Sequence, residues 1–458
     1  MATLDDDSVY KVDSYDDLEL TLVQVAADAD ARNNEEQTEE VIDNPPESGS
    51  SEFNYKYDDE RLKLKRKLRS YEEKEDISRP KYSRNQDGKP NRQESEERGK
   101  LKRKYDESEN VQAEDVEGHA KVVATHYNAL EEKGLDERSK SRVFHLRKFH
   151  NWIKSILINE YLTKIRDHKK HNEPIRSLDM CCGKGGDLFK WRKGNITHLI
   201  CSDIASVSLE QCKVRYQDMK TRNFRERGGT LFTTEYIVAD CTKVRLREKY
   251  KDPSIELDIV SCQFAFHYCF ESLPQAECMI KNASECLRPG GFFIGTTTDA
   301  NELLTRVRNS ESNSFGNSVY NVIFDCDIEK PPLFGAKYHF YLDGSVDCPE
   351  FLVYFPLFIK LARKYGLKLV RKEKFNDFYE RMKVEGKTLL TTTKSLETYP
   401  AQHGAQLVGT DDDYEHAKLC WEKNGRNSRI GTLSRSEWEA TSLYITFAFE
   451  KVKGTRNK

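Results

Sequence analysis

Residues 175–187, IRSLDMCCGKGGD, form the stretch on which the fold of this chain depends. Its first half, 175–180, has the length and apolar character of a short buried strand. The glycines at 183, 185 and 186 stand where that strand must turn abruptly into a helix. Glycine suits such a turn because, without a Cβ, it tolerates positive φ and lets a ligand approach the backbone closely.

Acidic residues recur at the ends of the strands that are expected next. Asp203 follows Gly183 by 20 residues and ends the apolar run HLICSDI, and Asp240 ends the run IVADC. Asp179 lies on the first strand. An α/β nucleotide site places a carboxylate at the end of its second strand, where it holds ribose hydroxyls. The three acids and the glycine turn therefore favour an adenosine ligand, with Asp203 for the ribose and Asp240 for the adenine amino group.

Two other nucleotide motifs fit the glycine turn poorly. A P-loop is excluded. Its pattern GxxxxGK[ST] requires a glycine before Lys184 across a four-residue spacer and a Ser or Thr directly after Lys184, and the chain has neither. A nicotinamide dinucleotide is disfavoured, because CCGKGGD does not match GxGxxG.

Strands and helices are expected to alternate along the chain. The expected strands are 175–180, 198–204, 235–239, 257–263, 292–296, 368–374 and 442–451; the expected helices are 119–130, 137–166, 187–191, 207–220, 274–287 and 351–365. This rhythm predicts an α/β, Rossmann-like, doubly wound sheet of seven mostly parallel strands, with its ligand at the carboxyl ends of the strands. Residues 315–342 are expected to form a β-hairpin insertion, and the first two helices precede the sheet.

Composition limits how much of the chain can form a core. Of 458 residues 33% are charged, and the mean hydropathy is −0.79. Residues 1–116 show no sustained hydrophobic period and are expected to be a disordered tail, which leaves 117–458 as one ordered domain. No signal peptide or apolar run of the ~20 residues that span a membrane is found. The 12 cysteines lack zinc-ligand spacing, so reduced thiols and no metal site are expected.

The net charge of −3 conceals an uneven distribution. Residues 1–50 hold 15 acidic and 2 basic side chains, so the rest of the chain carries a formal +10. A basic body suits a protein that handles a polyanion. The runs RLKLKRKLR (61–69) and KLKRK (100–104) predict nuclear import, with simple solvated charge as the alternative.

Longer motifs narrow the adenosine hypothesis. The chain contains SRVFHLRKFHNWIKS, CGKGGDLFKW, SDIASVSLEQCKVRYQDM, SCQFAFHYCFES, PGGFFIGTT, CPEFLVYFP and GTLSRSEWEATSLYITFAFE. Over 143–452 it thereby resembles the eukaryotic mRNA cap guanine-N7 methyltransferases, a family of Rossmann-like, S-adenosylmethionine-dependent enzymes. The resemblance implies S-adenosylmethionine as cofactor and the capped 5′ end of mRNA as substrate. It also implies a nuclear location, and as partners an activating subunit and the capping machinery.

The resemblance also implies which residues touch the ligands. Cofactor contacts fall on Lys154, Cys181, Asp203, Asp240, Gln263 and Tyr268. Cap contacts fall on His150, Asn151, Lys184, Lys190, Arg215, His267, Glu350 and Tyr444. Lys154 is expected to pair with the methionine carboxylate. Glu350, expected in the first turn of the helix over 351–365, is assigned to the guanine edge.

Two positions depart from the family's pattern. Cys181 stands where the glycine loop usually begins with Gly, and His150 stands where relatives often carry Asn. No catalytic acid or base is expected, because guanine N7 has a free lone pair and the methyl group sits on an activated sulfonium. Two alternatives are a methyltransferase of this fold acting on another RNA position or a small molecule, and an inactive RNA-binding scaffold.

Overall fold

The computed structural model describes residues 118–129, 140–170, 172–227, 231–401, 406–425 and 428–453. The tail predicted over 1–116, with both of its basic runs, lies outside the described residues. None of the described helices has the length and apolar character needed to cross a membrane.

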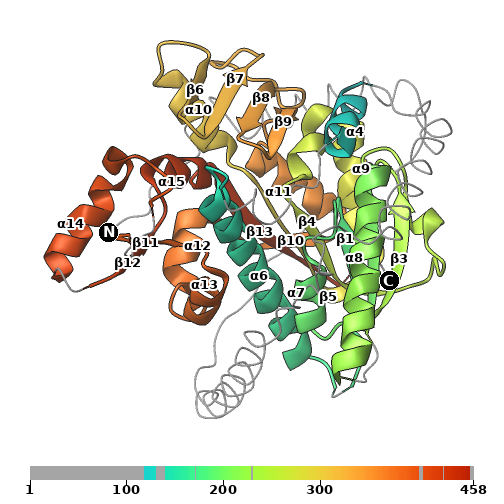
Figure 1. The fold of residues 1–458 in the computed structure, drawn as a ribbon. Coiled ribbons are helices and arrows are strands. Elements are labelled where there is room, and N and C mark those ends of the chain that lie inside the picture. Colours follow the sequence, from blue (N-terminus) through green and yellow to red (C-terminus); the bar gives the residue numbers. More distant parts are fainter. Residues whose placement is uncertain are drawn as a thin grey trace, which may run out of the picture. The chain divides into compact units, whose positions relative to one another are not determined.

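A seven-stranded sheet organises the described residues, as the sequence predicts. Its strands are β1 (Arg176–Met180), β2 (His198–Asp203), β3 (Thr233–Val238), β4 (Leu257–Gln263), β5 (Leu287–Thr298), β10 (Leu367–Lys374) and β13 (Tyr444–Lys451). Their order is β10-β13-β5-β4-β1-β2-β3 (Figure 1). β13 runs antiparallel to both of its neighbours, β10 and β5, and the pairs from β5 to β3 are parallel. Met180 pairs with Ser202 and Cys262, so the carboxyl ends of the central strands lie at one edge.

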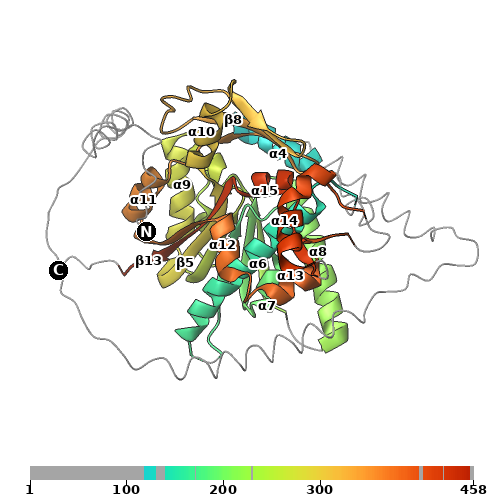
Figure 2. The same cartoon turned by 90° about the vertical axis from the view of Figure 1, so that its left-hand side faces the viewer.

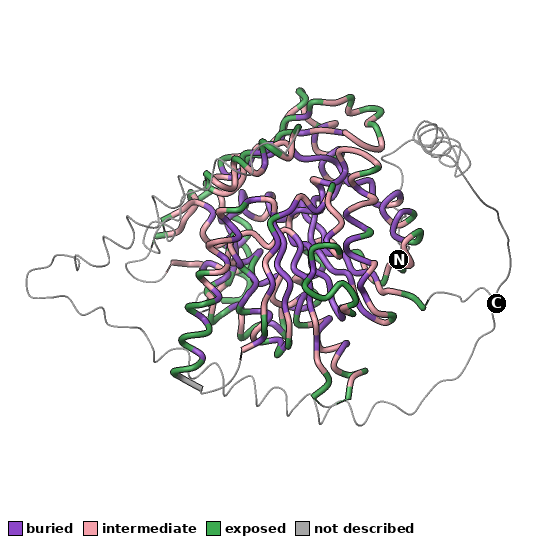
Figure 3. The backbone as a smooth tube through the Cα atoms, turned by 90° about the vertical axis from the view of Figure 1, so that its right-hand side faces the viewer, coloured by how far each residue is buried: buried purple, intermediate pink, exposed green. Residues whose placement is uncertain are grey.

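Helices cover both faces of this sheet. Figure 2 shows α6 (Phe144–Asp167) and α12 (Phe375–Met382) on one face, and α9 (Leu273–Ser284) and α11 (Phe355–Lys364) on the other. The strands are therefore the most buried part of the described chain (Figure 3). Helix α6 presents an apolar stripe that includes the fully buried Phe149 and Trp152. Large aromatic side chains bury about 150–250 Å² each, so this stripe fixes α6 against its neighbours.

Further elements lie outside this sheet. They are α4 (His119–Ala129), α7 (Leu188–Lys193), α8 (Ser206–Arg227), η3 (Leu246–Lys249), η4 (Phe266–Glu271), α10 (Ala300–Arg308), α13 (Lys387–Thr393), β11 (Glu397–Tyr399), η5 (Asp411–Tyr414), α14 (Glu415–Asn424), β12 (Ile430–Thr432) and α15 (Arg435–Thr441). Among them, β11 and β12 pair to form a separate two-stranded sheet. No element was predicted between residues 375 and 441. Residues 288–291, RPGG, lie inside β5, where Gly290 has a φ of 78°.

The insertion is larger than the predicted hairpin. It is a four-stranded antiparallel sheet of β6 (Ser314–Gly316), β7 (Tyr320–Phe324), β8 (Lys337–Leu342) and β9 (Val346–Phe351). The prediction that Glu350 stands in the first turn of a helix from 351 is therefore wrong, because Glu350 lies on β9. Pro349 suggested a helix start, but proline is also tolerated on an edge strand such as β9. The proline that does begin the helix is Pro356, in the first turn of α11.

Candidate active site

The glycine loop after β1 turns sharply through left-handed backbone conformations. Cys181, Gly183 and Gly185 have φ values of 56°, 52° and 73°. A Cβ at Gly185 would stand 2.7 Å from Cys212 Sγ, so only glycine fits there. A Cβ at Gly183 would meet nothing within 4 Å, so open space lies in front of the loop at this point.

Two of the three predicted acids border this loop as ligand-binding carboxylates should. Asp203 accepts from the backbone N–H of Gly183 (2.7 Å) and of Ala205 (2.8 Å), and burial raises its pKa to about 6. Asp240 Oδ1 accepts from Thr242, whereas its buried Oδ2 has no hydrogen-bond partner among the described residues. A buried acceptor normally has a donor. An adenine amino group could supply one, so the residues present fit an adenosine cofactor.

The third acid points elsewhere. Asp179 is buried, and its Oδ2 accepts from Trp191 Nε1 at 3.1 Å. Burial and the nearby Asp187 charge raise the pKa of Asp179 well above its usual range. Asp179 therefore anchors α7 beneath the loop, which leaves Asp203 and Asp240 as the candidate ligand-binding acids.

A charged cluster that the sequence analysis missed lies beside the loop. Asp187 Oδ1 is 2.8 Å from the ammonium groups of both Lys154 and Lys190. Burial alone would raise the pKa of Asp187, but the two lysines hold it well below its usual range. Asp187 therefore fixes Lys154, the predicted partner of the methionine carboxylate.

Lys190 is turned into this cluster. Besides Asp187, its ammonium donates to Asn151 Oδ1 (2.6 Å) and to the Gly186 carbonyl (3.0 Å). A lysine has three donors, so a contact from Lys190 to the cap requires that one of these bonds be exchanged. Asn151 is the only one of the predicted cap residues bonded to it in the described structure.

Gln263 is the last residue of β4, and Tyr268 lies in η4, which follows it. The Gln263 amide donates to Ser261 Oγ and accepts from Thr296 Oγ1, which fixes its orientation. The Tyr268 hydroxyl lies 3.3 Å from the Tyr127 hydroxyl, so helix α4 also borders this part of the site. Tyr127 was not among the predicted site residues.

Aromatic rings form a wall next to these residues. The His150 ring stacks on Phe264 at 5.1 Å between centroids, and Tyr444 stacks on Phe375 at 5.5 Å. Burial lowers the pKa of His150 to about 3, so its imidazole is neutral. Phe264 has a φ of 58°, which is rare for a bulky residue and is typical of functional sites. A sequence pattern alone gives no signal for this conformation.

A buried polar cluster stands behind the wall. Glu350 is 3% exposed; its Oε2 accepts from the Tyr338 hydroxyl at 2.8 Å, and its Oε1 lies 3.3 Å from His267 Nε2. Tyr338 also hydrogen bonds with Thr298 at 2.9 Å. Tyr444 is buried near these residues, and burial and then the Glu350 charge raise the pKa of Tyr444 well above its usual range. Tyr338, on the neighbouring strand β8, was missed.

The last two predicted cap contacts lie apart from this cluster. Lys184 is a half-buried residue of the glycine loop, and Arg215 is half-buried on α8. The thiols of Cys182 and Cys201, and then the nearby Arg215 charge, lower the pKa of Cys212, which packs against Gly185. Both cations therefore lie on the side of the glycine loop and α8.

The thiol groups of Cys182, Cys201 and Cys212 converge behind the same loop. Their sulfur atoms all lie within 4.8 Å of one another, a grouping that could hold a metal ion. The three residues come from the loop, β2 and α8, so no sequence spacing announces them. The expected absence of a metal site stays a prediction.

Cys181 yields a test of the loop's geometry. Its thiol lies beside those of Cys241 and Cys262, while its backbone is in a conformation that glycine adopts more easily. We expect Cys181→Gly to tighten S-adenosylmethionine binding, measured by calorimetry. Stability should change by less than about 1 kcal/mol, because relieved strain is offset by the ~0.5–1 kcal/mol of added unfolded-state entropy. Weaker binding by folded protein would instead show that the thiol contact is favourable.

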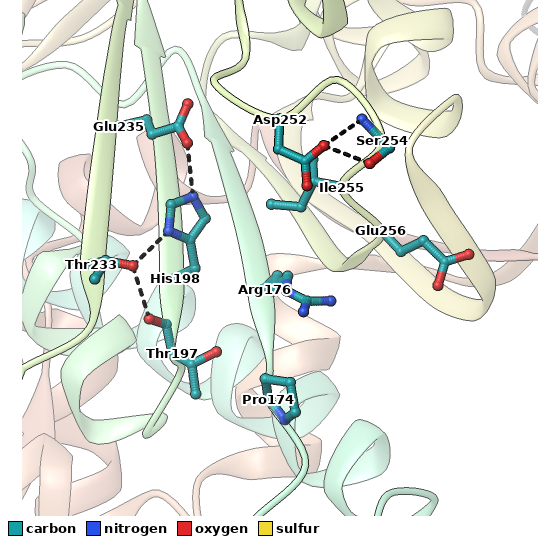
Figure 4. Close-up of a pocket in the computed structure, with 10 residues that line it drawn as sticks. All are labelled: Pro174, Arg176, Thr197, His198, Thr233, Glu235, Asp252, Ser254, Ile255 and Glu256. Carbon is teal, nitrogen blue, oxygen red and sulfur yellow. Dashed lines mark hydrogen bonds and ion pairs between the residues drawn. The ribbon is translucent and has the colours of Figure 1, made fainter.

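A cavity of about 630 Å³ opens at the other edge of the sheet. Arg176, His198 and Thr233, the first residues of β1, β2 and β3, line it (Figure 4). The His198 ring bridges Thr233 and Glu235 across the strands. Ligands of doubly wound sheets bind at the carboxyl ends of the strands. This cavity is therefore not the candidate active site.

Comparison with known proteins points to one family. A family model described as "mRNA (guanine-N(7))-methyltransferase domain" matches residues 110–452. An mRNA cap guanine-N(7) methyltransferase from Drosophila melanogaster is 52% identical over 337 residues, covering 73% of this chain and 78% of the fly protein. The Caenorhabditis elegans protein of that name is 40% identical, covering 73% and 88%. A rice (Oryza sativa) relative is 36% identical, covering 72% and 81%.

Proposed function

Since the chain belongs to the mRNA cap guanine-N7 methyltransferase family, we propose that Glu350, His267 and Tyr444 hold the cap guanine, and that Asp203, Asp240, Gln263 and Lys154 hold the cofactor. The activity is S-adenosylmethionine-dependent methylation of N7 of the guanine cap of mRNA. The observation that supports the guanine assignment best is the burial of Glu350. The Glu350 carboxylate is 3% exposed and lies in a cluster bordered by aromatic rings. It is therefore suited to accept hydrogen bonds from the two adjacent donors of guanine, N1–H and the N2 amino group.

The cofactor supplies an activated methyl group. Asp203 would accept from ribose hydroxyls while it holds Gly183, and Asp240 Oδ2 would accept from the adenine amino group. Lys154, which is held in place by Asp187, would neutralise the methionine carboxylate. No side chain has to remove a proton from guanine N7. The chain's contribution is then orientation, worth up to ~7–11 kcal/mol in favourable cases, and electrostatics.

The Glu350 charge would act on the reaction itself. As the methyl group moves, positive charge spreads into the purine ring. A buried carboxylate at the guanine edge attracts that charge more strongly in the transition state than in the ground state. Such a contact accelerates the reaction instead of only binding the substrate.

Methyl transfer from radiolabelled S-adenosylmethionine tests this proposal. GpppG-ended RNA should be labelled at N7, and the same RNA without a cap should not. Label at another position of the RNA would favour the alternative of a methyltransferase of this fold that acts on another RNA position. The absence of transfer by a protein that still binds RNA would favour the scaffold.

We further propose that the protein acts in the nucleus, with an activating subunit and the capping machinery as partners. The basic runs at 61–69 and 100–104 support the location, and family membership supports the partners. Removal of residues 1–109 retains the whole matched region, so methylation of a short capped RNA should persist in vitro. In cells the truncated protein should leave the nucleus. Lost activity in the purified truncated protein would place part of the catalytic domain within the tail.

A further inference from the structure

A second cavity, of about 380 Å³, lies between helices α6 and α13. Its lining residues are Lys148, Asn151, Trp152, Ser155, Leu389, Thr392 and Thr393. Lys148, the neighbouring pair Asn151 and Trp152, and Ser155 follow one another along α6 at steps of three or four residues, so they lie on one side of the helix. We call this cavity the α6–α13 groove.

The groove begins at the candidate active site. Asn151 lines it, and the Oδ1 of the same side chain accepts from Lys190 at 2.6 Å. Lys190 in turn contacts the Gly186 carbonyl in the glycine loop. On α6, His150 and Lys154 face the site, and Asn151 is the groove residue next to them. A chain that leaves the site past Asn151 therefore enters the groove.

The groove is positively charged. Lys148 is the only charged residue among its seven lining residues. Lys394, the next residue after α13, adds a second ammonium; burial and then the Lys394 charge lower the pKa of Lys148. The Lys148 ammonium lies 4.3 Å from the Phe144 ring centroid and has no carboxylate partner among the described residues. An anion in the groove would relieve the repulsion between the two lysines.

Hydroxyl groups in the groove are set as acceptors. Ser155 Oγ donates to the Asn151 carbonyl at 2.7 Å, and Thr392 Oγ1 donates to the Thr388 carbonyl at 2.8 Å. A hydroxyl has one proton, so both oxygens can only accept from a ligand. The ribose 2′-hydroxyl is a donor that RNA has and DNA lacks.

We propose that the α6–α13 groove binds the sugar–phosphate backbone of the RNA nucleotides that follow the cap. This inference rests on the proposed function, because it makes the groove the exit path of the capped strand. Lys148 and Lys394 contact phosphates, and Ser155 and Thr392 accept from 2′-hydroxyls. The groove then raises affinity for capped RNA over the free cap without reading its sequence.

The first experiment removes the two charges with Lys148→Gln/Lys394→Gln. KM is measured for the GpppG dinucleotide and for a short capped RNA over a range of salt concentrations. For the capped RNA we expect KM to rise about tenfold and the slope of log KM against log salt to fall by about 1.4, roughly 0.7 for each single-strand phosphate contact. The dinucleotide should be unaffected. Lys360→Gln, at an exposed lysine on α11, is the matched control and should change neither substrate.

The second experiment tests recognition of the ribose. A capped strand with 2′-deoxy sugars after the cap should bind less tightly than capped RNA to the wild-type protein. Ser155→Ala/Thr392→Val should lose this difference. Binding is measured by fluorescence anisotropy, so the result does not depend on turnover.

The outcomes separate this inference from the proposed function. Unchanged KM and salt slope for capped RNA in the lysine variant overturn the groove. An equal loss with GpppG also overturns it, because the lysines would then act on the cap site or on folding. If the wild-type protein methylates neither substrate, the proposed function fails, while the anisotropy comparison of RNA with deoxy strand still decides whether the groove binds RNA.

Discussion

Replacing Glu350 by Gln is expected to lower kcat/KM for capped RNA by more than the ~1–3 kcal/mol that one unsatisfied buried group costs. Glutamine keeps the size of the side chain but turns one acceptor into a donor, which would face the guanine N1–H or amino group. The loss of charge also removes attraction for the positive charge that develops on the purine. Steady-state kinetics with GpppG-ended RNA measure the effect, and cofactor affinity should change little.

The melting temperature of Glu350→Gln should be unchanged or higher. Glu350 is 3% exposed, and its nearest basic group is His267 at 3.3 Å, so removal of its charge relieves a desolvation cost. Glu437→Gln is the control: this fully buried glutamate caps α15 and accepts from the Leu146 N–H. Its variant should melt lower yet keep most of its activity when folded. If Glu350→Gln melts several degrees lower and turns over normally, Glu350 is structural.

An inosine cap tests whether Glu350 selects the base. Inosine lacks the N2 amino group, so it offers a carboxylate only one of guanine's two donors. Wild-type protein should methylate the inosine cap more slowly than the guanine cap. In Glu350→Gln this difference should shrink. An undiminished preference would place the amino group against another residue.

Local sequence signals predicted the sheet because each of its strands carries its own pattern. The strand β4 was expected at 257–263 and occupies those residues, and the glycine turn fixed the loop before α7. The start of α11 was misplaced because Pro349 and Glu350 are good helix-start residues, and only pairing with β8 shows that they belong to a strand. That choice depends on tertiary contacts that local propensity does not contain.

The proposed site residues come from the sequence to the extent that they belong to long motifs. Asp203 and Asp240 follow from strand ends, and Glu350 and His267 from the family resemblance. Tyr338 and Tyr127 are brought in by β8 and α4, far from the motifs in sequence, and the ion cluster of Asp187 needs α6 packed beside the loop. These contacts arise from packing between elements, so no pattern within one segment predicts them.

Replacing Asp203 by Asn is expected to weaken S-adenosylmethionine binding about a hundredfold, roughly 3 kcal/mol, because two charge-assisted contacts are affected. Asp203 uses one oxygen for the Gly183 N–H and the other for the Ala205 N–H. Asparagine has one oxygen, so its amino group must face one of these donors. The loop then loses a hydrogen bond, and the ribose loses a carboxylate acceptor. Isothermal titration calorimetry measures the affinity.

The same carboxylate should make cofactor binding depend on pH. Burial raises the pKa of Asp203 to about 6, so the group is charged above that pH and protonated below it. A protonated carboxyl accepts ribose hydroxyls more weakly, so affinity should be constant above pH 6 and fall by up to about tenfold per pH unit below it. Asp203→Asn should bind weakly at every pH, without this dependence. Asp252→Asn, at the opposite edge of the sheet, should keep the wild-type profile. If the Asp203→Asn variant retains the acid-side loss of affinity, another group titrates, and the ribose assignment of Asp203 loses its support.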